Sequence, residues 1–336
     1  MGLIDKILYA LNLIAAILLM LSFITPYIPP QDFPLLSALS LMVSPLLIVN
    51  FLFVVYWLIR LKKRIWLSAL LLVVGYFNFG SFWKWGGADD AQTADQLKML
   101  SFNVQLFEAY KDEPDPQVFD KLKTLINEQD PDVLLIQEFY RVDTDVFDVF
   151  PHQFIHFKND HKLGYAIFSK HPLLNKGAFD FRSTTNNTIF ADIVTRTDTL
   201  RVYNLHLQSF KISPSVSALQ DRSTKQLRNR IRKGFKLQQE QVISILEHSD
   251  ASGYPVIMGG DLNNTAFSYV YRKIAQKYQD AYDQAGSGLG TTFTFDFYPV
   301  RIDYIFADPT LKVLDFQTLK RPFADHRPLV TTLGWD

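Results

Sequence analysis

The sequence predicts an α/β domain in which two packed β-sheets are flanked by helices, preceded by a helical region that lies in a membrane. Three observations lead to this prediction. Residues 1–86 contain three long uncharged stretches. From residue 97 onward, short apolar runs typical of strands alternate with segments of helical periodicity. The sequence contains no cysteine, which excludes disulfides, zinc–thiolate sites and thiol nucleophiles.

The amino-terminal region contains apolar stretches at residues 7–25, 35–59 and 65–82, the third of which includes two glycines and an asparagine. At about 1.5 Å per residue, each is long enough, or nearly so, to cross a hydrocarbon core of about 30 Å. We therefore predict about three transmembrane helices within residues 1–86, with two spans and an interfacial helix as the alternative. A cleaved signal peptide is the rival interpretation of the first stretch, but two further stretches follow it.

Basic residues predict the orientation of these helices. The segment 60–64, between the second and third stretches, carries four basic residues, whereas the loop 26–34 carries none. Positively charged loops stay in the cytoplasm. We therefore expect the amino terminus inside the cell and the domain after the third span outside it. Residues 87–96 are mostly polar or small and predict a short linker.

Formal charge is distributed unevenly along the chain. Residues 1–86 carry six Lys and Arg against two Asp and Glu, and the remainder carries 28 against 32. A mildly acidic domain does not favour tight binding to nucleic acid through bulk charge. One segment of it, 219–236, is nevertheless strongly basic, with Asp221 as its single acid. Its basic residues are Arg222, Lys225, Arg228, Arg230, Arg232, Lys233 and Lys236. They predict either a solvated helix face or a surface for a phosphate-rich partner, namely lipid headgroups or a nucleic acid strand.

The remaining residues divide into predicted strands and helices. Runs rich in Val, Ile, Leu and Phe predict strands, because such residues fit a half-buried pleated surface. These runs are residues 98–102, 133–136, 165–168, 189–194, 200–205, 256–258, 302–306 and 329–333. Apolar residues spaced three or four apart predict helices, and these segments are residues 118–129, 219–248 and 267–278. Residues 195–199 predict a hairpin between two of the strands.

Polar side chains of the kind that handle phosphate and magnesium recur at the ends of the predicted strands. Each alone is weak evidence, since a single histidine is more often a surface or satisfied core residue. Their recurrence at six strand ends favours a site. The residues are Asn103, Glu138, His206, Asp261, Asn263, Arg301, Asp303, Asp325 and His326. Gly259 and Gly260 precede Asp261, which is typical of a strand end that something approaches closely.

These residues stand in six short motifs, in the order SFNV, QE, NLHL, GDLN, RIDYIF and ADH. The ordered set resembles the endonuclease/exonuclease/phosphatase superfamily, whose fold is DNase I-like, over essentially all of residues 97–336. The resemblance implies a four-layer α/β sandwich of two packed mixed sheets flanked by helices, with the active site at one edge. Bacterial members with an amino-terminal group of membrane helices are similar to the whole chain. We therefore expect a multi-pass protein of the bacterial inner or plasma membrane whose catalytic domain is periplasmic or extracellular.

The resemblance also implies a divalent cation, Mg²⁺ with Mn²⁺ as the alternative, bound through oxygen ligands. Glu138 matches the family's principal metal ligand, assisted by Asn103 and Asp325. Phosphodiester cleavage needs such a hard cation, a deprotonated water and stabilisation of charge on the phosphoryl oxygens. Gly259 and Gly260 are expected to let a phosphate and its metal come close to the strand end.

Further roles are implied by the same resemblance. Asp261 and Asn263 are expected to orient the attacking water and hold the phosphate. His326 is expected to be the general base or a phosphate donor, with Asp303 as the carboxylate that fixes its tautomer. His206 is expected to donate to the phosphoryl oxygen or assist the leaving group. In the nuclease branch this histidine has its own carboxylate partner upstream, and here that region offers no unambiguous candidate, although one aspartate is nearby.

Three hypotheses from different classes follow. The first is a membrane-anchored, metal-dependent phosphodiesterase acting on a lipid headgroup or a small phosphodiester, with the lipid bilayer as a partner and no protein partner evident. The second is an exported nuclease acting on DNA or RNA, for which a broadly basic domain would be expected. The third is a non-catalytic membrane scaffold, for which degraded motifs would be expected, whereas all six motifs are intact.

Overall fold

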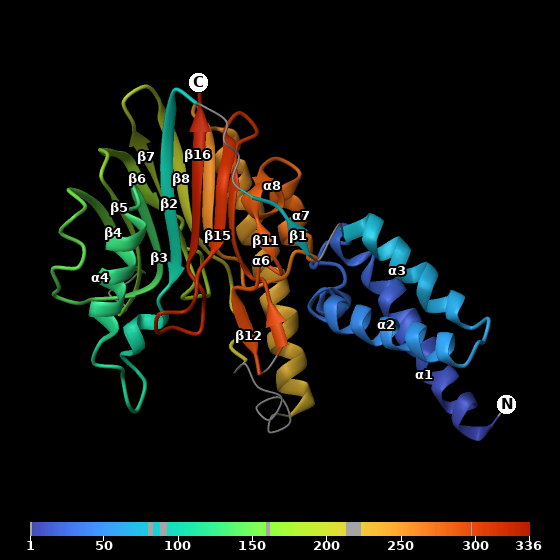
Figure 1. Cartoon of the computed structure of the whole chain (residues 1–336). Helices are drawn as coiled ribbons and strands as arrows, with labels where there is room; N and C mark the ends of the chain where they lie inside the picture. Colours follow the sequence, from blue (N-terminus) through green and yellow to red (C-terminus); the bar gives the residue numbers. More distant parts are fainter. Residues whose placement is uncertain (1, 80–82, 88–92, 159–161, 213–222, 297) are drawn as a thin grey trace.

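The amino-terminal helices project to one side of a two-sheet domain (Figure 1). The computed structural model describes residues 2–79, 83–87, 93–158, 162–212, 223–296 and 298–336. The projecting part consists of three α-helices and two short 3₁₀ helices within the described residues. They are α1 (Leu3–Ser22), η1 (Thr25–Tyr27), η2 (Leu36–Met42), α2 (Val43–Ile59) and α3 (Ile65–Phe79).

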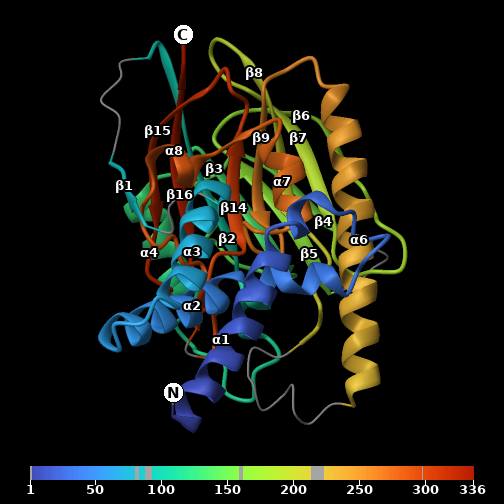
Figure 2. The same ribbon diagram turned by 90° about the vertical axis from the view of Figure 1, so that its right-hand side faces the viewer.

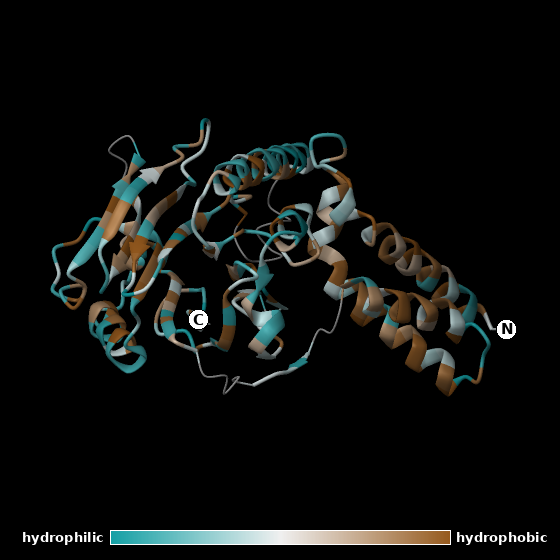
Figure 3. Cartoon of the chain, turned by 90° about the horizontal axis from the view of Figure 1, so that it is seen from above, coloured by the Kyte–Doolittle hydropathy of each residue, from teal (hydrophilic) through white to brown (hydrophobic). Residues whose placement is uncertain are grey.

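Two helical stretches among the described residues, Leu3–Tyr27 and Leu36–Ile59, are long and apolar enough to cross a membrane. The third apolar helix, Ile65–Phe79, is shorter. Residues 80–82, which the sequence assigns to the third span, lie outside the described part of the chain. Figure 3 shows how strongly hydrophobic this group of helices is compared with the rest of the fold. The amino-terminal helices could therefore span a membrane.

Polar side chains lie between these helices rather than on their outer faces. The amide nitrogen of Asn12 donates to the hydroxyl of Ser68 at 2.6 Å, and that hydroxyl donates to Asn50 at 2.9 Å. The indole of Trp57 donates to the side-chain oxygen of Asn12 at 2.9 Å. All four side chains are fully buried. Hydrogen bonds between helices with apolar outer faces are typical of helix packing in a membrane.

The first sheet of the domain has the strand order β15–β16–β2–β3–β5–β4. Its strands are β15 (Lys312–Thr318), β16 (Leu329–Trp335), β2 (Asp95–Asn103), β3 (Val133–Tyr140), β5 (Leu163–Ser169) and β4 (His152–Phe157). The pair β2–β3 is parallel and the other pairs are antiparallel. The outer face is covered by α4 (Val118–Gln129), whose Leu122 and Ile126 pack with Leu134 and Phe168.

The second sheet has the order β10–β14–β9–β8–β7–β6. Its strands are β10 (Gln279–Asp280), β14 (Asp303–Ala307), β9 (Val256–Asp261), β8 (Thr199–His206), β7 (Thr188–Val194) and β6 (Leu173–Ala178). Only β8–β9 is parallel among these described pairs. Helices α6 (Thr224–Asp250) and α7 (Tyr269–Ala275) cover its outer face, and the two sheets share an apolar core. Helix, sheet, sheet and helix make the predicted four-layer sandwich.

Every predicted strand and the 195–199 hairpin are present, but β4, β6, β10 and β15 of the two large sheets were not predicted. All four lie at sheet edges, where one side of the strand faces solvent and the apolar pattern is interrupted. The predicted helix 118–129 coincides with α4, whereas the other two predicted helices are longer than α6 and α7. Helix α6 begins at Thr224 because the Ser223 hydroxyl caps it, and residues 219–222 of the prediction lie outside the described part. Helix α7 is similarly capped by Ser268.

Strand direction brings the predicted site residues to one edge. The parallel neighbours β2 and β3 end together, with Asn103 opposite Gln137. The parallel neighbours β8 and β9 also end together, with His206 opposite Asp261. Strand β14 runs the other way and starts at this edge, with Asp303 opposite Asp261. In Figure 1 this is the lower edge of the domain, because β16, antiparallel to β2, ends at the top.

Candidate functional site

Asp261, at the end of β9, lies at the centre of the site. One carboxylate oxygen accepts a hydrogen bond from the amide of Asn103 at 3.2 Å, and the other accepts from the backbone of Asn263 at 2.6 Å. The same carboxylate lies 3.7 Å from Nε2 of His206 and 3.8 Å from Nε2 of His326. Asp261 is 1% exposed. The two sheets thus meet at a buried carboxylate.

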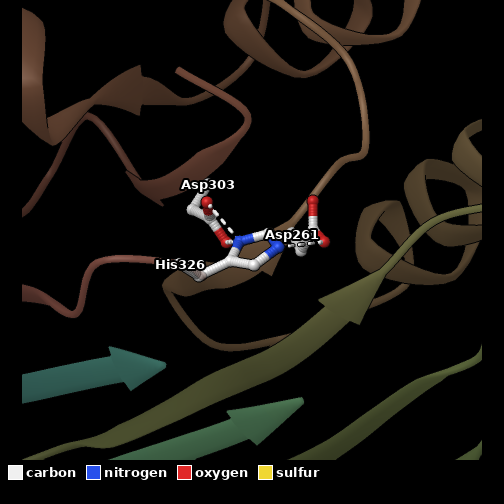
Figure 4. A group of neighbouring side chains, drawn as sticks. All are labelled: Asp261, Asp303 and His326. Atoms are coloured by element: carbon white, nitrogen blue, oxygen red, sulfur yellow. Dashed lines mark hydrogen bonds and ion pairs between the residues drawn. The ribbon is translucent and has the colours of Figure 1, made fainter. Parts of the chain in front are cut away.

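His326 and Asp303 form a pair, as Figure 4 shows. Nδ1 of the imidazole lies 3.0 and 2.9 Å from the two carboxylate oxygens of Asp303. The backbone N–H of Asp303 donates to the hydroxyl of Thr292, and the ring of Phe293 packs against the imidazole at 4.9 Å between centroids. The pair is buried, so its geometry is held by packing as well as by hydrogen bonds.

The protonation of this group follows from its burial and its crowding. Burial raises the pKa of Asp261 to about 8, and the neighbouring Asp303 adds to the rise. Burial by itself would lower the pKa of His326, but the fields of Asp303 and Asp261 outweigh it and raise that pKa to about 10. Oxygen or nitrogen atoms of Asp261, Asp303 and His326 all lie within 4.8 Å of one another. Three side chains this close together can share a proton or bind a cation between them.

Glu138 approaches the site from the other sheet. It sits in β3 with a left-handed backbone, φ 53°, where the pairing with β5 shifts register. Such a bulge re-aims a side chain. Its carboxylate lies 3.6 Å from Nε2 of His206 and keeps 25% of its side-chain surface exposed. Burial raises its pKa, and the negative charge of Asp325 contributes to the rise.

The donor atoms here fit a hard divalent cation. Glu138, Asp325 and Asn103 offer oxygen ligands of the kind that Mg²⁺ prefers. The pKa values of Glu138 and Asp261 are both raised by burial and by other carboxylates. A bound cation would offset that repulsion. Among the described residues, Asp261, Asp303 and His326 also bring possible ligand atoms within 4.8 Å of one another.

Both ring nitrogens of His206, at the end of β8, lie within hydrogen-bond distance of other side chains. Nδ1 lies 3.3 Å from the hydroxyl of Tyr165, which donates to the carbonyl of Thr185. Nε2 lies 2.9 Å from the amide nitrogen of Asn186, whose oxygen accepts from the backbone of Ser209. Burial lowers the pKa of His206 to about 3. The ring is therefore neutral, with the proton on Nδ1 and Nε2 as an acceptor.

Tyr165 and Asn186 are the site residues that sequence reasoning missed. Tyr165 occupies the position beside Nδ1 where a carboxylate was sought, and the aspartate near that region, Asp160, lies outside the described residues. The signal was present but weak: Tyr165 stands in an otherwise apolar run, and Asn186 in the polar segment 183–188. Neither stands at the end of a strand that enters the site.

Asn263 and Asp325 lie at the rim. Asn263 has a left-handed backbone, φ 49°, and its amide donates to the carbonyl of Leu207 at 3.0 Å. It is partly exposed, as is Asp325. The structure therefore brings eight of the nine predicted residues to one edge of the sandwich, where five are buried and Glu138, Asn263 and Asp325 are partly exposed. The ninth, Arg301, instead forms an ion pair with Asp280 at 2.6 Å.

The packing of the sheets requires the two glycines before Asp261. A Cβ at Gly259 would lie 2.7 Å from the side chain of Leu135 in the facing sheet. Gly260 has φ 138°, and a Cβ there would overlap the carbonyl oxygen of Leu205 in β8. The two glycines let the two sheets and the two parallel strands approach closely enough to bring their ends together.

Clustered carboxylates and histidines at the edge of a DNase I-like sandwich define a class of hydrolases that act on phosphoester bonds. The chain belongs to the Endonuclease/Exonuclease/phosphatase family, whose model matches residues 100–326. A second family model, described as a domain of unknown function, matches residues 5–82. None of the curated proteins compared with the chain matches it.

Solved structures share the fold. An endonuclease/exonuclease/phosphatase from Beutenbergia cavernae is 18% identical, with a TM-score of 0.53, over 71% of this chain and 72% of that one. Truncated TDP2 from Caenorhabditis elegans is 17% identical, with a TM-score of 0.52, over 73% and 100%. The catalytic domain of human Nocturnin, with a bound sulfate anion, is 20% identical, with a TM-score of 0.51, over 72% and 95%. At these identities the likeness establishes the fold.

Proposed function

We propose that this protein is a membrane-anchored, divalent-metal-dependent phosphodiesterase whose catalytic domain faces the periplasm or the cell exterior. Residues 1–86 would form the membrane region, 87–96 the linker and 97–336 the catalytic domain. The observation that carries the proposal is the convergence of Asn103, His206, Asp303 and His326 on the buried carboxylate of Asp261.

The metal would be Mg²⁺, with Mn²⁺ as the alternative, held by Glu138 with Asn103 and Asp325. When bound, it would supply Lewis-acid stabilisation of charge on the phosphoryl oxygens. The raised pKa of Glu138 supports this assignment, because a carboxylate crowded by other acids gains most from a cation beside it.

His326 and Asp303 would act as a unit. Asp303 accepts from Nδ1, and Nε2 of the ring faces a second carboxylate, that of Asp261. The negative charges on both sides of the imidazole favour the doubly protonated ring. Of the two roles open to His326, this arrangement favours a phosphate donor over a general base. Asp261 and Asn263 would then orient the attacking water and hold the phosphate.

His206 and Asn186 would act together on a phosphoryl oxygen or on the leaving group. Nε2 of His206 accepts one hydrogen of the Asn186 amide, and each primary amide carries two. The second hydrogen of Asn186 can donate to substrate while His206 holds the amide in place. The neutral ring is suited to this, because a buried imidazolium would repel the donor.

The position of α6 supports a substrate at the bilayer surface. In Figures 1 and 2 the first half of α6 extends toward the bottom of the view, as does the amino-terminal end of α1, although the two helices are inclined to each other. Gln31, in the loop before η2, donates its backbone N–H to the side-chain oxygen of Gln239 at 2.8 Å, and its side-chain amide donates to Glu240 at 2.8 Å. The middle of α6 is thus tied to the loop between the first two apolar helices.

The basic residues of α6 continue from that contact toward the site edge. Lys225, Arg228, Arg230, Arg232 and Lys233 are exposed, and none of them has an ion-pair partner in the described part of the chain. A row of exposed cations beside apolar helices suits anionic lipid headgroups. We therefore favour a lipid phosphodiester. The same cations favour nucleic acid as the second candidate, which would make the protein an exported nuclease.

A substrate panel tests the proposal. The full chain, purified in detergent, is assayed with Mg²⁺ and with EDTA against phospholipid vesicles, plasmid DNA, RNA and bis-p-nitrophenyl phosphate, beside Asp303→Asn as the inactive control. We expect magnesium-dependent release from vesicles. Preferential cleavage of DNA or RNA would favour the alternative, an exported nuclease. The absence of hydrolysis with every substrate would contradict the proposal that the protein is an enzyme.

A charge variant separates surface binding from chemistry. Arg228→Gln, Arg232→Gln and Lys233→Gln together should slow hydrolysis of anionic vesicles but leave bis-p-nitrophenyl phosphate hydrolysis unchanged, because the latter is not presented by a surface. Equal loss on both substrates would mean that these residues do not act by binding a surface.

A further inference from the structure

A cavity of about 900 Å³ lies between the amino-terminal helices and the catalytic domain. Its walls come from η1, α2 and α3 on one side and from α7, α8 (Ala281–Ala285) and β13 (Tyr298–Val300) on the other. The volume is near the upper end of the range of about 300–1,000 Å³ that ligand pockets occupy. Asp261, Asp303 and His326 are not among its lining residues, so it is separate from the site described above.

The two walls differ in chemistry. The helices contribute Leu47, Ile48, Phe51 and Leu72, which are apolar, and Ile48 and Phe51 continue onto the exposed outer face of α2. The catalytic domain contributes mostly polar side chains, which include Thr291, Tyr298, Gln276, Arg272 and Arg301. A cavity with one apolar and one polar wall suits an amphiphile, and its apolar wall is continuous with the surface that would contact lipid.

The polar wall carries an excess of positive charge. Arg301 is neutralised by Asp280 at 2.6 Å, and Asp283 is neutralised by Lys84 at 3.1 Å. Arg272 lies over the ring of Tyr27, 4.1 Å from its centroid, and has no carboxylate partner among the described residues. Its guanidinium is therefore available to an anion, and Arg is well suited to phosphate.

We propose that this cavity binds an anionic membrane phospholipid, with an acyl chain along α2 and α3 and the phosphate of the headgroup at Arg272. Arg272 also lies at the level where the phosphate of a membrane lipid is expected. Arg272 packs on Tyr27 of η1, which directly follows the first apolar helix, so the cation stands where that helix would leave the bilayer. Anionic headgroups and aromatic rings both occupy this level.

The bound lipid would strengthen the contact between the two parts of the chain. Apart from the cavity, the contact includes the hydroxyl of Thr265 donating to the carbonyl of Ser40 at 2.8 Å, and the ring of Phe267 packing on Phe79 at 4.8 Å. Thr265 follows Asn263 by two residues, so the cavity wall adjoins the site rim. Lipid in the cavity is therefore expected to stabilise the full chain against heat.

Arg272→Gln tests the proposal, with Lys273→Gln as its matched control. Lys273 is the next residue of α7, loses the same charge, and packs on Tyr269 outside the cavity. The full chain in mild detergent is titrated with phosphatidylglycerol, phosphatidylcholine or inorganic phosphate while its melting temperature is followed. We expect phosphatidylglycerol to stabilise the wild type and Lys273→Gln, and Arg272→Gln to need about fivefold more of it, the contribution of one cation near an anionic surface.

Three outcomes would overturn the proposal: equal stabilisation by phosphatidylcholine, a full effect of inorganic phosphate alone, or equal loss in the two Gln variants. A second variant guards against misfolding. Ala275 is an exposed lining residue, and Ala275→Trp would fill the cavity without changing charge. It should lower the phospholipid that co-purifies with the protein, measured by mass spectrometry of the extract. Unchanged lipid content in a folded Ala275→Trp would also contradict the proposal.

Discussion

The protonation state of Asp261 depends on the groups that surround its carboxylate. Its carboxylate has two hydrogen-bond donors, Asn103 and the backbone of Asn263, and two imidazoles within 3.8 Å. Burial nevertheless raises its pKa to about 8. Ionising it next to Asp303 is costly unless positive charge stands beside it. His326 supplies that charge in the described structure, and a divalent cation would supply more.

Glu138→Gln should weaken magnesium activation while keeping the fold, because it removes a charged oxygen ligand and preserves shape. The magnesium concentration for half-maximal activity should rise on the order of tenfold or more. Glu128→Gln, on the exposed face of α4, is the matched control. A magnesium titration of both variants decides the matter: if Glu138→Gln keeps the wild-type curve, Glu138 does not bind the metal.

His326→Ala and Asp303→Asn should each slow hydrolysis of the best substrate on the order of 100- to 1,000-fold, the usual cost of removing a donor that stabilises charge in the transition state. The double variant should be little slower than either single one, because residues that act as a unit lose non-additively. Rates of all three are compared after folding has been checked by circular dichroism. Losses that multiply in the double variant would mean that the 2.9 Å contact between the two side chains does not couple them in catalysis.

The motifs predicted which residues meet, but not how each is bonded. The meeting of Asp261, Asp303 and His326 was implied by the family resemblance of their motifs, and in the structure Asp303 pairs opposite Asp261 while His326 bonds to Asp303. The orientation of His206 could not be predicted, since it depends on Tyr165 and Asn186, which reach the ring from other segments. Hydrogen-bond partners that come from positions without a motif are found only once the chain is folded in three dimensions.

At the scale of elements, strand β9 depends on its two glycines. Parallel pairing with β8 puts Gly260 against Leu205 and Asp261 against His206. In the first sheet, the left-handed bulge at Glu138 also brings a side chain to the site, because it turns the Glu138 side chain out of the pleat toward the second sheet. Both irregularities lie at the site, where strained backbone is most often found.

Gly260→Ala should destabilise the domain by about 2–5 kcal/mol, because it combines backbone strain at a positive φ with a steric overlap against β8. Gly253→Ala is the control, because a Cβ at that position would have no other atom within 4 Å and its φ is not in the left-handed region. That substitution should be neutral or stabilising by up to about 1 kcal/mol. Thermal unfolding of both variants gives the comparison. Equal melting temperatures would show that the strand relaxes around the new methyl group.

Interior strands could be predicted from the sequence and edge strands could not. Strand β3 begins with five consecutive fully buried residues, Val133 to Gln137, and its apolar run is plain. Strand β6 is mostly exposed or half-exposed, and its LLNKGA sequence has no apolar pattern. The short pair β1 (Lys84–Trp85) and β11 (Ser287–Gly288) is set by tertiary contact rather than by local preference.

At the scale of the whole molecule, the amino-terminal helices and the domain are joined by more than a linker. Strand β1, which follows the apolar helices, pairs with β11 of the domain. Gln31 bonds to α6 and Ser40 to Thr265. These contacts join segments that are far apart in the sequence, so composition could not predict them. The sequence predicts a domain boundary at residue 86, but in the structure the helices before it and the domain after it are in contact.

The basic segment 60–64 should be cytoplasmic and the domain exported, because Lys and Arg are absent from the loop between the first two apolar helices. Alkaline phosphatase and a fluorescent protein that matures only in the cytoplasm are fused separately after Gln96. Phosphatase activity without fluorescence is expected. The reverse result would overturn the orientation and favour two spans, in agreement with the short α3.

The position of β16 determines when the first sheet can be completed. Strand β2 is made first among the strands of that sheet and β16 last, yet they pair along their length, from Ser101 with Leu329 to Asp95 with Trp335. Closing so long a loop is slow. Until β16 arrives, one edge of β2 stays open to pairing with other chains. Folding of the domain should therefore be limited by the return of the last strand of this sheet to the first.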